Sequence, residues 1–517
     1  MRGKSIIKLL AATLIFCHVS CNEFLDELPD NRTELDSKEK IAWLLTSAYS
    51  NSLFLFTAEM SSDNYDDFGE TYSTMGRLQE ELFHWEAVTD DGDESPKQVW
   101  GGYYSAIAHA NQALQAIAQL GNPPDLDAQR GEALMCRAYH HFILVNVFCK
   151  HFSELTGHID LGIPYVEQPE TVTAPHYERG TVVEVYEKIE RDLEEALPLI
   201  DDAVYTVPKY HFNRAAAYAF ATRFYLYYRK YDKVIEYAGE VLGSNPAGMI
   251  RNTVIFSDMP DHDIIANEYI KPEHNANLLL MTGFSQMGVL FGPYGYGKRY
   301  MHSTKLSEAE VTADGPWGVT NPYFPMLTYS YGPFGFTSVG KLPYLFEYTD
   351  PVAQIGYPHT VLVALGSDEV LLNRAEAYVL QDNYDAAAAD IGTWVRGHLK
   401  GATVPTRNDI HLFYNRLAYY TSTAPTVKKR LNPERPVMPR SEQESFLHCI
   451  LHIRRIELLF EGLRWFDIKR YGIEITRREV NTTLQIIETD KLTLSDPRRA
   501  IQLPADVITA GLTPNPR

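Results

Sequence analysis

Apolar residues recur every three or four positions along most of the chain, which is the spacing that places them on one face of an α-helix. Helix start and stop signals separate these stretches: Asp36 and Ser37 precede one of them, Pro198 lies near the end of another, and residues 243–246 (GSNP) follow a third. The pattern predicts helices over residues 98–120, 127–150, 181–200, 212–229, 231–243, 367–381, 384–400 and 442–471. We therefore expect an all-α protein.

Two of these helical stretches resemble each other. YLYYRKYDKVIEYA (225–238) and YVLQDNYDAAAADI (378–391) each contain Tyr, five further residues and then Tyr-Asp, so Tyr231 and Tyr384 take the same place in both. In a 34-residue helix–turn–helix frame, Pro246 falls where the first unit should end. The likeness predicts tetratricopeptide-like helix pairs, and the alternative is a chance match between two helical hairpins.

Two other regions lack this periodicity. Residues 250–360 are rich in Gly, Pro and aromatic residues, and residues 61–97 are acidic and polar with scattered aromatic residues. Loops on a rigid helical frame are where binding residues are most often found. We expect both regions to be irregular and to carry the functional site.

Charge and composition narrow the class of partner. The formal net charge is −20, which opposes binding to nucleic acid, and 45% hydrophobic residues allow a large core. Aromatic residues make up 12% of the chain and include 33 Tyr, a side chain with an apolar ring and a polar tip. This surplus of tyrosine suits a ligand-binding surface.

The N-terminus has the pattern of an export signal. Arg2, Lys4 and Lys8 are followed by a short apolar run, residues 9–16, well below the roughly 20 apolar residues that span a membrane. A small residue then precedes Cys21, which resembles the acylation motif of bacterial lipoproteins. We predict a lipoprotein signal peptide over 1–20 and lipid attachment at Cys21; an ordinary signal peptide is the alternative.

The remaining cysteines give no disulfide framework. Cys136, Cys149 and Cys449 are an odd number and lie far apart in the sequence. Cys136 and Cys149 fall in one predicted helix, where thirteen residues correspond to a rise of about 20 Å, too far for a bridge. We expect all three to be buried free thiols.

The stretch RRIELLFEGLRWFDIKRYG (454–472) raises the alternative of an enzyme. Glu457 and Glu461 are four residues apart, and on one helix they could act as a catalytic pair of carboxylates. Arg454 and Arg464 are each three residues from one of these acids, and such pairing opposes the raised pKa of a general acid. We therefore predict a packed helix with neighbouring ion pairs and no catalytic residues.

Metal and cofactor motifs are missing from the sequence, which has no HExxH, paired-cysteine cluster, EF-hand loop or GxxxxGK motif. The acidic run 90–94 (DDGDE) could hold Ca²⁺, although a solvated turn is the simpler interpretation. We predict neither a metal nor a cofactor.

Seven segments, taken in order, resemble the SusD/RagB family of Bacteroidetes outer-membrane nutrient-binding lipoproteins. They are CNEFLDELPDN (21–31), WGGYYSAIAHANQAL (100–114), GEALMCRAYHHFILVNVF (131–148), 180–200, 214–242, 367–391 and the C-terminal pair 454–472 and 496–516. The resemblance implies a single SusD-like domain over 21–517 with four tetratricopeptide-like helix pairs and an irregular loop-rich capping region. The helical scaffold would cover about 36–243 and 365–471, with insertions at about 61–97 and 250–360.

The resemblance also implies a function without catalysis. Members of this family are lipid-anchored and surface-exposed at the cell outer membrane, where they bind an oligosaccharide or sometimes a peptide. They close as a lid over a TonB-dependent outer-membrane transporter of the SusC/RagA type. Glycan binding is our first expectation, and peptide binding or a tetratricopeptide-like adaptor for another protein are the alternatives.

Sugars stack their C–H faces on aromatic rings and need donors and acceptors for their hydroxyl groups. We therefore choose aromatic, Asn and Asp residues of the two irregular regions as candidate ligand contacts. They are Asp63, Asn64, Tyr65, Tyr72, Tyr294, Tyr296, Trp317 and Tyr323.

Overall fold

A computed structural model describes residues 35–74, 76–170, 176–290, 298–320, 327–331, 334–480 and 485–517. The predicted signal peptide and Cys21 lie outside these residues. Within the described ranges, no helix combines the length and the apolar character needed to cross a membrane.

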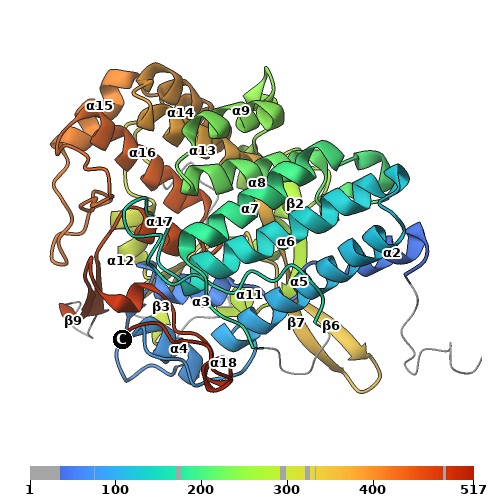
Figure 1. Cartoon of the computed structure of the whole chain (residues 1–517). Coiled ribbons are helices and arrows are strands. Elements are labelled where there is room, and N and C mark those ends of the chain that lie inside the picture. The colour runs from blue at the N-terminus through green and yellow to red at the C-terminus, as the bar shows by residue number, and fades with distance from the viewer. Residues whose placement is uncertain are drawn as a thin grey trace, which may run out of the picture.

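The N-terminal half is a stack of long helices. It contains α2 (Lys38–Leu45), α3 (Leu55–Ser61), α5 (Pro96–Gln119), α6 (Asp127–Phe148) and α7 (Val182–Ala196). Helix α6 packs between α5 and α7, and nearly all of its residues are buried (Figure 1). Local caps fix where these helices begin: the side chains of Ser37, Ser95 and Thr181 accept backbone N–H groups of α2, α5 and α7.

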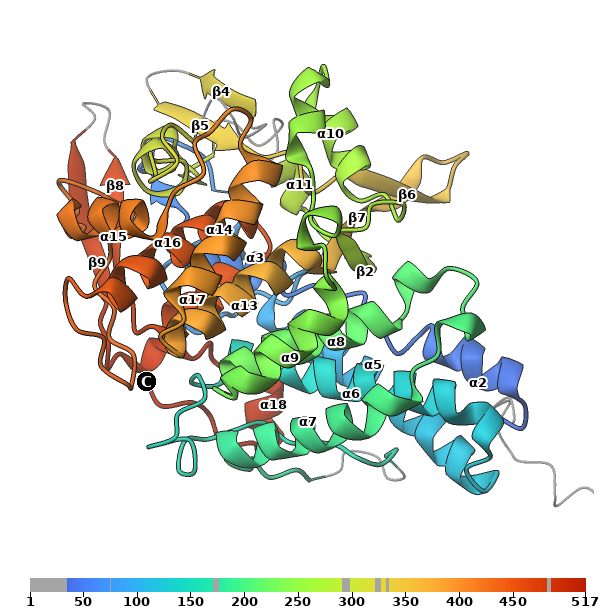
Figure 2. The same cartoon turned by 90° about the horizontal axis from the view of Figure 1, so that it is seen from above.

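The two predicted repeats are helix pairs, as expected. They are α8 (Arg214–Tyr227) with α9 (Tyr231–Leu242), and α13 (Ser367–Leu380) with α14 (Tyr384–His398). Tyr231 and Tyr384 each open the second helix of their pair. Although about 120 residues separate the pairs in the sequence, α13 packs directly on α9 (Figure 2), and Gln381 Nε2 donates to Asp232 Oδ1 at 2.6 Å. Helices α5 and α6 also pack on each other, as do α15 (Arg407–Arg416) and α16 (Glu442–Glu457); the expected number of four tetratricopeptide-like pairs stays a prediction.

The predicted helix over 442–471 is wrong in one respect, because it is broken. Helix α15 (Arg407–Arg416) precedes α16 (Glu442–Glu457), and a turn then leads to α17 (Leu463–Arg470). In that turn Phe460 has a φ of +68° and Gly462 a φ of +78°, which a continuous helix does not allow. Glu457 and Glu461 are therefore not neighbours on one helix face.

The two regions expected to be irregular contain short strands as well as loops. Together with β8 and β9, which lie C-terminal to both regions, the strands of the described residues form three small sheets, with the orders β3-β1-β8-β9, β2-β7-β6 and β4-β5. Their bounds are β1 (Asp66–Asp67), β2 (Asn277–Phe284), β3 (Tyr300–Met301), β4 (Leu327–Tyr331), β5 (Phe334–Ser338), β6 (Leu345–Asp350), β7 (Ile355–Gly366), β8 (Ile475–Val480) and β9 (Ile486–Leu492). Short helices accompany them: α4 (Arg77–Phe83), α10 (His262–Tyr269), α11 (Met287–Leu290), α12 (Thr304–Leu306) and α18 (Ala505–Thr509).

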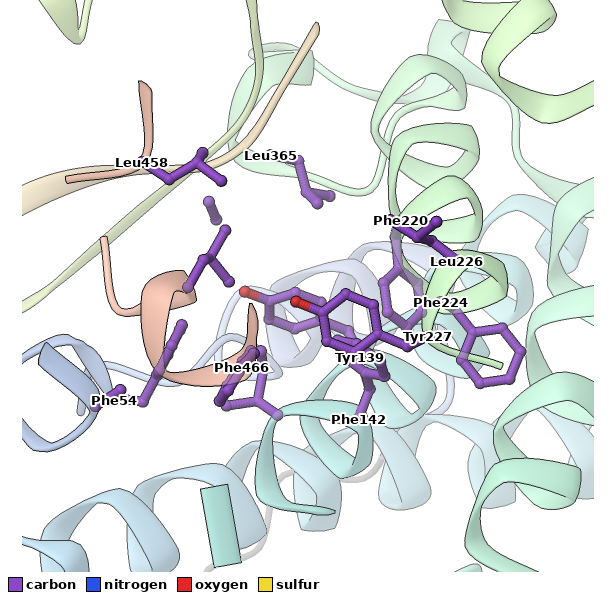
Figure 3. Packing of buried hydrophobic residues seen from close by; sticks show 14 of the residues in the cluster. Phe54, Tyr139, Phe142, Phe220, Phe224, Leu226, Tyr227, Leu365, Leu458 and Phe466 are labelled. Carbon is purple, nitrogen blue, oxygen red and sulfur yellow. The ribbon is translucent and has the colours of Figure 1, made fainter. Parts of the chain in front are cut away.

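One apolar core joins the N-terminal and C-terminal helices. Figure 3 shows Phe220 and Phe224 of α8 packed near Phe142 of α6, while Phe466 of α17 faces Phe54. The rings of Phe54 and Phe466 are stacked, with centroids 5.5 Å apart. Cys136, Cys149 and Cys449 are buried free thiols in this core, which confirms the prediction.

Candidate functional site

The two regions that were expected to carry the site meet in a short strand pair. Asp66 and Asp67 of β1 lie antiparallel to Met301 and Tyr300 of β3. Backbone hydrogen bonds extend this contact on both sides, from Phe68 N to Arg299 O at 2.8 Å and from Arg299 N to Ser73 O at 3.1 Å. We call the surface formed here by Tyr72, Glu80, Lys298 and Arg299 the seam.

A second contact ties the same two regions together. Glu94 ends the acidic run 90–94 and is buried, and its carboxylate accepts from Ser285 Oγ at 2.6 Å and from the Gln286 backbone N–H at 2.8 Å. Burial raises the pKa of Glu94 to about 7. One acid of the run therefore anchors the first region to the insertion, while Asp90 caps the Gly92 backbone N–H in an exposed turn.

Arg299 supplies a fixed positive group at the seam. Its guanidinium donates to both oxygens of the buried Asp67, from Nε at 2.8 Å and from Nη2 at 2.9 Å, and Glu80 lies 3.7 Å away. These hydrogen bonds to Asp67 raise the pKa of Arg299. The side chain remains 16% exposed, so a preoriented donor faces the solvent at low entropic cost.

Tyr72 supplies an aromatic ring to the seam, one residue before Ser73, whose backbone oxygen accepts from Arg299 N at 3.1 Å. It is partly exposed and packs against the buried Phe68, with ring centroids 5.9 Å apart. A supported ring of this kind offers an apolar face to a sugar C–H surface, and neighbouring charged side chains can bind hydroxyl groups. The seam therefore has the residue types of a carbohydrate contact.

Three other candidates lie in the interior. Asp63, Asn64 and Tyr65 are at most 6% exposed, and all three contact the C-terminal helices. Asp63 accepts two bonds of 2.8 Å from Arg464 and one of 2.7 Å from Lys429.

Asn64 Oδ1 accepts from Arg455 Nε at 3.0 Å, and the ring of Tyr65 stacks on Phe460. Burial would raise the pKa of Asp63, but the cations Arg455, Arg464 and Lys429 hold it well below its usual range. Within the fold, Asp63 and Asn64 pair with these cations and the Tyr65 ring packs on Phe460, and the role of the three residues as ligand contacts stays a prediction.

Trp317 lies at the base of an open depression of about 770 Å³, which Phe413, Asp409 and Arg416 also line. The indole itself is only 2% exposed, and its Nε1 donates to Thr320 Oγ1 at 2.8 Å. Its role as a ligand contact stays a prediction. Tyr294, Tyr296 and Tyr323 lie outside the residues whose positions are described.

Glu457 and Glu461 pair with residues outside the 454–472 segment, which corrects their predicted neighbouring pairs, whereas Asp467 pairs within the segment, with Arg470 at 2.7 Å. Arg454 pairs with Asp467 at 2.9 Å, and Arg464 pairs with Asp63. Glu457 lies 3.1 Å from His398, and Glu461 lies 3.3 Å from Lys341.

Burial would raise the pKa of Glu457, but His398 opposes it and lowers the value, whereas burial raises the pKa of Glu461 to about 7. The predicted depression of carboxylate pKa therefore applies to Glu457 and to Asp467, where Arg454 and Arg470 outweigh burial, but not to Glu461. Both acids are less than one-tenth exposed and bonded within the core.

Among the residues that the structure describes, one group brings three metal-ligand atoms within 4.8 Å of one another: Asp368, His398 and Glu457. All three are buried, and the cations Arg251 and Lys341 lie beside the same carboxylates. Two cations already at the carboxylates oppose a divalent ion, so we do not assign a metal centre here.

The residue that our sequence reasoning missed is Arg299. It follows Lys298 at the end of the aromatic GPYGYGKRY segment, and this basic pair in an otherwise acidic protein was the available indication. Its partner Asp67 lies 232 residues away, so the pairing itself has no local signature.

Two protein-family models match this chain. The family model described as "Starch-binding associating with outer membrane" matches residues 23–226, and the model described as "SusD family" matches residues 368–502. The chain belongs to the SusD/RagB family. A search of curated proteins finds no match.

Solved structures of similar fold cover nearly the whole chain. One is a putative sugar binding protein from Bacteroides vulgatus, with a TM-score of 0.66 and 18% identity over 94% of this chain and 99% of that one. A SusD superfamily protein from Bacteroides thetaiotaomicron has a TM-score of 0.60 and 19% identity over 93% and 99%. A SusD-like carbohydrate binding protein from Bacteroides vulgatus has a TM-score of 0.63 and 16% identity over 91% and 96%.

Proposed function

We propose that this protein is a non-catalytic, lipid-anchored component of the outer surface that captures oligosaccharides and passes them to a TonB-dependent outer-membrane transporter of the SusC/RagA type. The observation that carries the proposal is the seam, where the segment of the partly exposed Tyr72 pairs through its backbone with the segment of Arg299 on a SusD-like scaffold. The sugar-binding descriptions of the similar structures agree with it. In the same proposal, residues 21–517 form one SusD-like domain, because a single core includes residues from Ile41 to Leu512.

The predicted acylation of Cys21 would hold the protein at the membrane, and the remaining chain would present the seam to solvent. Energy for import would come from the transporter. Purification of the intact lipoprotein from its native membrane should bring down a TonB-dependent β-barrel. Recovery of the protein with no such barrel, under conditions that preserve a known pair of this type, would contradict the delivery step.

Replacement of Tyr72 with alanine is expected to weaken glycan binding about 3- to 10-fold, the loss of one aromatic stacking contact. The measurement is calorimetric titration of the mature protein with the best ligand from an oligosaccharide panel, with a peptide panel screened in parallel. Trp43→Ala is the matched control, because Trp43 is a 70% exposed aromatic residue on α2, outside the seam.

If the Tyr72 and Trp43 variants bind the glycan with equal affinity, the seam is not the binding site. The variant Trp317→Ala would then test the depression that Trp317 lines. Saturable binding of peptides with no binding of any glycan would overturn the choice of ligand class.

A further inference from the structure

Three helices of the C-terminal half bring a histidine between two carboxylates in the interior. Asp368 lies in the first turn of α13, His398 is the last residue of α14, and Glu457 is the last residue of α16. The His398 side chain is fully buried. Its Nε2 atom lies 3.1 Å from Glu457 Oε2 and 3.5 Å from Asp368 Oδ1.

The hydrogen bonds of this imidazole indicate its protonation. His398 Nδ1 is 3.0 Å from the backbone oxygen of Trp394, and because a carbonyl can only accept, Nδ1 carries a hydrogen. In a neutral ring Nε2 would then present a lone pair to two carboxylate oxygens, a repulsive arrangement in a dry interior. A protonated ring instead forms an ion pair with Glu457, whose Oε2 atom also accepts from Trp394 Nε1 at 3.0 Å.

The same cluster receives its other contacts from the insertion at 250–360. The backbone N–H of Arg251 donates to Asp368 Oδ1 at 2.9 Å, and Thr253 Oγ1 donates to the backbone oxygen of His398 at 3.0 Å. Lys341 Nζ donates to the backbone oxygen of Glu457. Two separate points of the insertion, near residues 251–253 and at residue 341, are therefore bound to the ends of three scaffold helices.

We propose that His398 is an imidazolium ion in the folded protein, and that its positive charge stabilises the contacts of the 250–360 insertion with helices α13, α14 and α16. The proton neutralises the repulsion between Asp368 and Glu457, and the contact from the Arg251 backbone requires the orientation of the Asp368 carboxylate. Its loss leaves these carboxylates facing a lone pair, and the segments 251–258 and 339–342 become easier to detach from the helices. This inference does not depend on which ligand the protein binds.

The carboxylates of Glu457 and Asp368 favour the protonation of His398, whereas the lowered pKa of Glu457 itself gives a contribution to stability that is lost as the pH falls. Burial would lower the pKa of His398, but Glu457 and then Asp368 outweigh it, so the pKa is raised above its ordinary value. Its contribution to stability is complete below the ordinary value of about 6.5 and is lost as the pH rises through the folded value.

Burial raises the pKa of Asp368, with Glu457 adding to the effect, and burial raises that of Glu461 to about 7, so these acids also release protons at higher pH than usual. The remaining charged or titratable groups around the cluster are Arg251, Lys341, Tyr269 of α10 and the ion pair of Arg223 with Glu369.

The direct test follows the exchange of the imidazole C2 hydrogen in wild-type protein by mass spectrometry, because this slow exchange reports the protonation of each histidine separately. The expected result is a titration of His398 above about 6.5. A titration below that value, as for a buried neutral histidine, overturns the proposal. Metal analysis and thermal unfolding with Zn²⁺ alone accompany the test: bound zinc, or stabilisation by zinc that His398→Gln abolishes, also overturns it.

Whether the proton on His398 stabilises the attachment of the insertion is tested with the variant His398→Gln and the control variant His109→Gln. His109 makes the same contact with a carbonyl four residues earlier, Ser105 O at 2.8 Å, but lies on α5. Backbone amide exchange over 253–258 should be about 10-fold faster in the His398 variant at neutral pH, with α5 and α6 unchanged, and the wild type should approach that rate as the pH rises. Unchanged exchange over 253–258, or equal effects of the two variants, would show that the proton does not fasten the insertion.

Discussion

Replacing Asp63 with alanine is expected to lower the free energy of unfolding by about 3–5 kcal/mol, since it leaves buried cations without their partner. Asp63 accepts from Arg464 and Lys429, and Arg455 lies 3.4 Å away. All four side chains are less than one-tenth exposed. Urea unfolding followed by circular dichroism gives the measurement.

The control for this prediction is Glu154→Ala. Both oxygens of Glu154 accept from Arg435 at 2.9 Å, but the two side chains are 44% and 66% exposed. Such a pair contributes between about 0 and 1 kcal/mol. Similar losses in the two variants would show that the buried network is no more important than a surface pair, and would favour a surface role for Asp63.

Gly462→Ala is expected to destabilise the protein by about 2–4 kcal/mol, the sum of backbone strain and overpacking. Gly462 has a φ of +78°, and a Cβ atom there would lie 2.7 Å from Phe54 Cε2 and 3.3 Å from Ala58 Cβ. Its backbone N–H also donates to the buried Glu59 at 2.9 Å. The element that approaches this glycine closely is α3 with the residue before it.

The matched control is Gly121→Ala. Gly121 has a similar φ of +85°, but a Cβ atom there would meet nothing within 4 Å. Its variant should lose only the strain of the left-handed conformation, about 1–2 kcal/mol. The difference between the two variants in urea unfolding measures the clash with Phe54, and equal losses would mean that α3 moves aside without cost.

The helices were predictable from the sequence because their periodicity and caps are local. The spacing of apolar residues located α5, α6, α8, α9, α13 and α14 to within a few residues. The break between α16 and α17 was not predicted, because apolar residues continue through Leu458, Leu459 and Phe460, and the close contact of Gly462 with Phe54 joins residues far apart in the sequence.

The site was harder to predict for a related reason. Composition located two regions, and the structure joins them through β1 and β3, but composition could not distinguish residues that face solvent from residues that face the core. Asp63 and Asn64 have the residue types of a sugar site and bind Arg464 and Arg455 within the fold. Such partners, some 390 to 400 residues distant, leave no pattern in the local sequence.

The packing of α13 on α9 affects how the insertion between these helices can vary in length and sequence during evolution. Ser367 Oγ donates to the Met249 backbone oxygen at 2.6 Å, so the two ends of the insertion lie next to each other. For a chain segment whose ends already meet, each doubling of length costs only about 0.6 kcal/mol of closure entropy. Loops within the segment could be lengthened, shortened or exchanged while the helices keep their neighbours, which allows ligand preference to diverge on a constant frame.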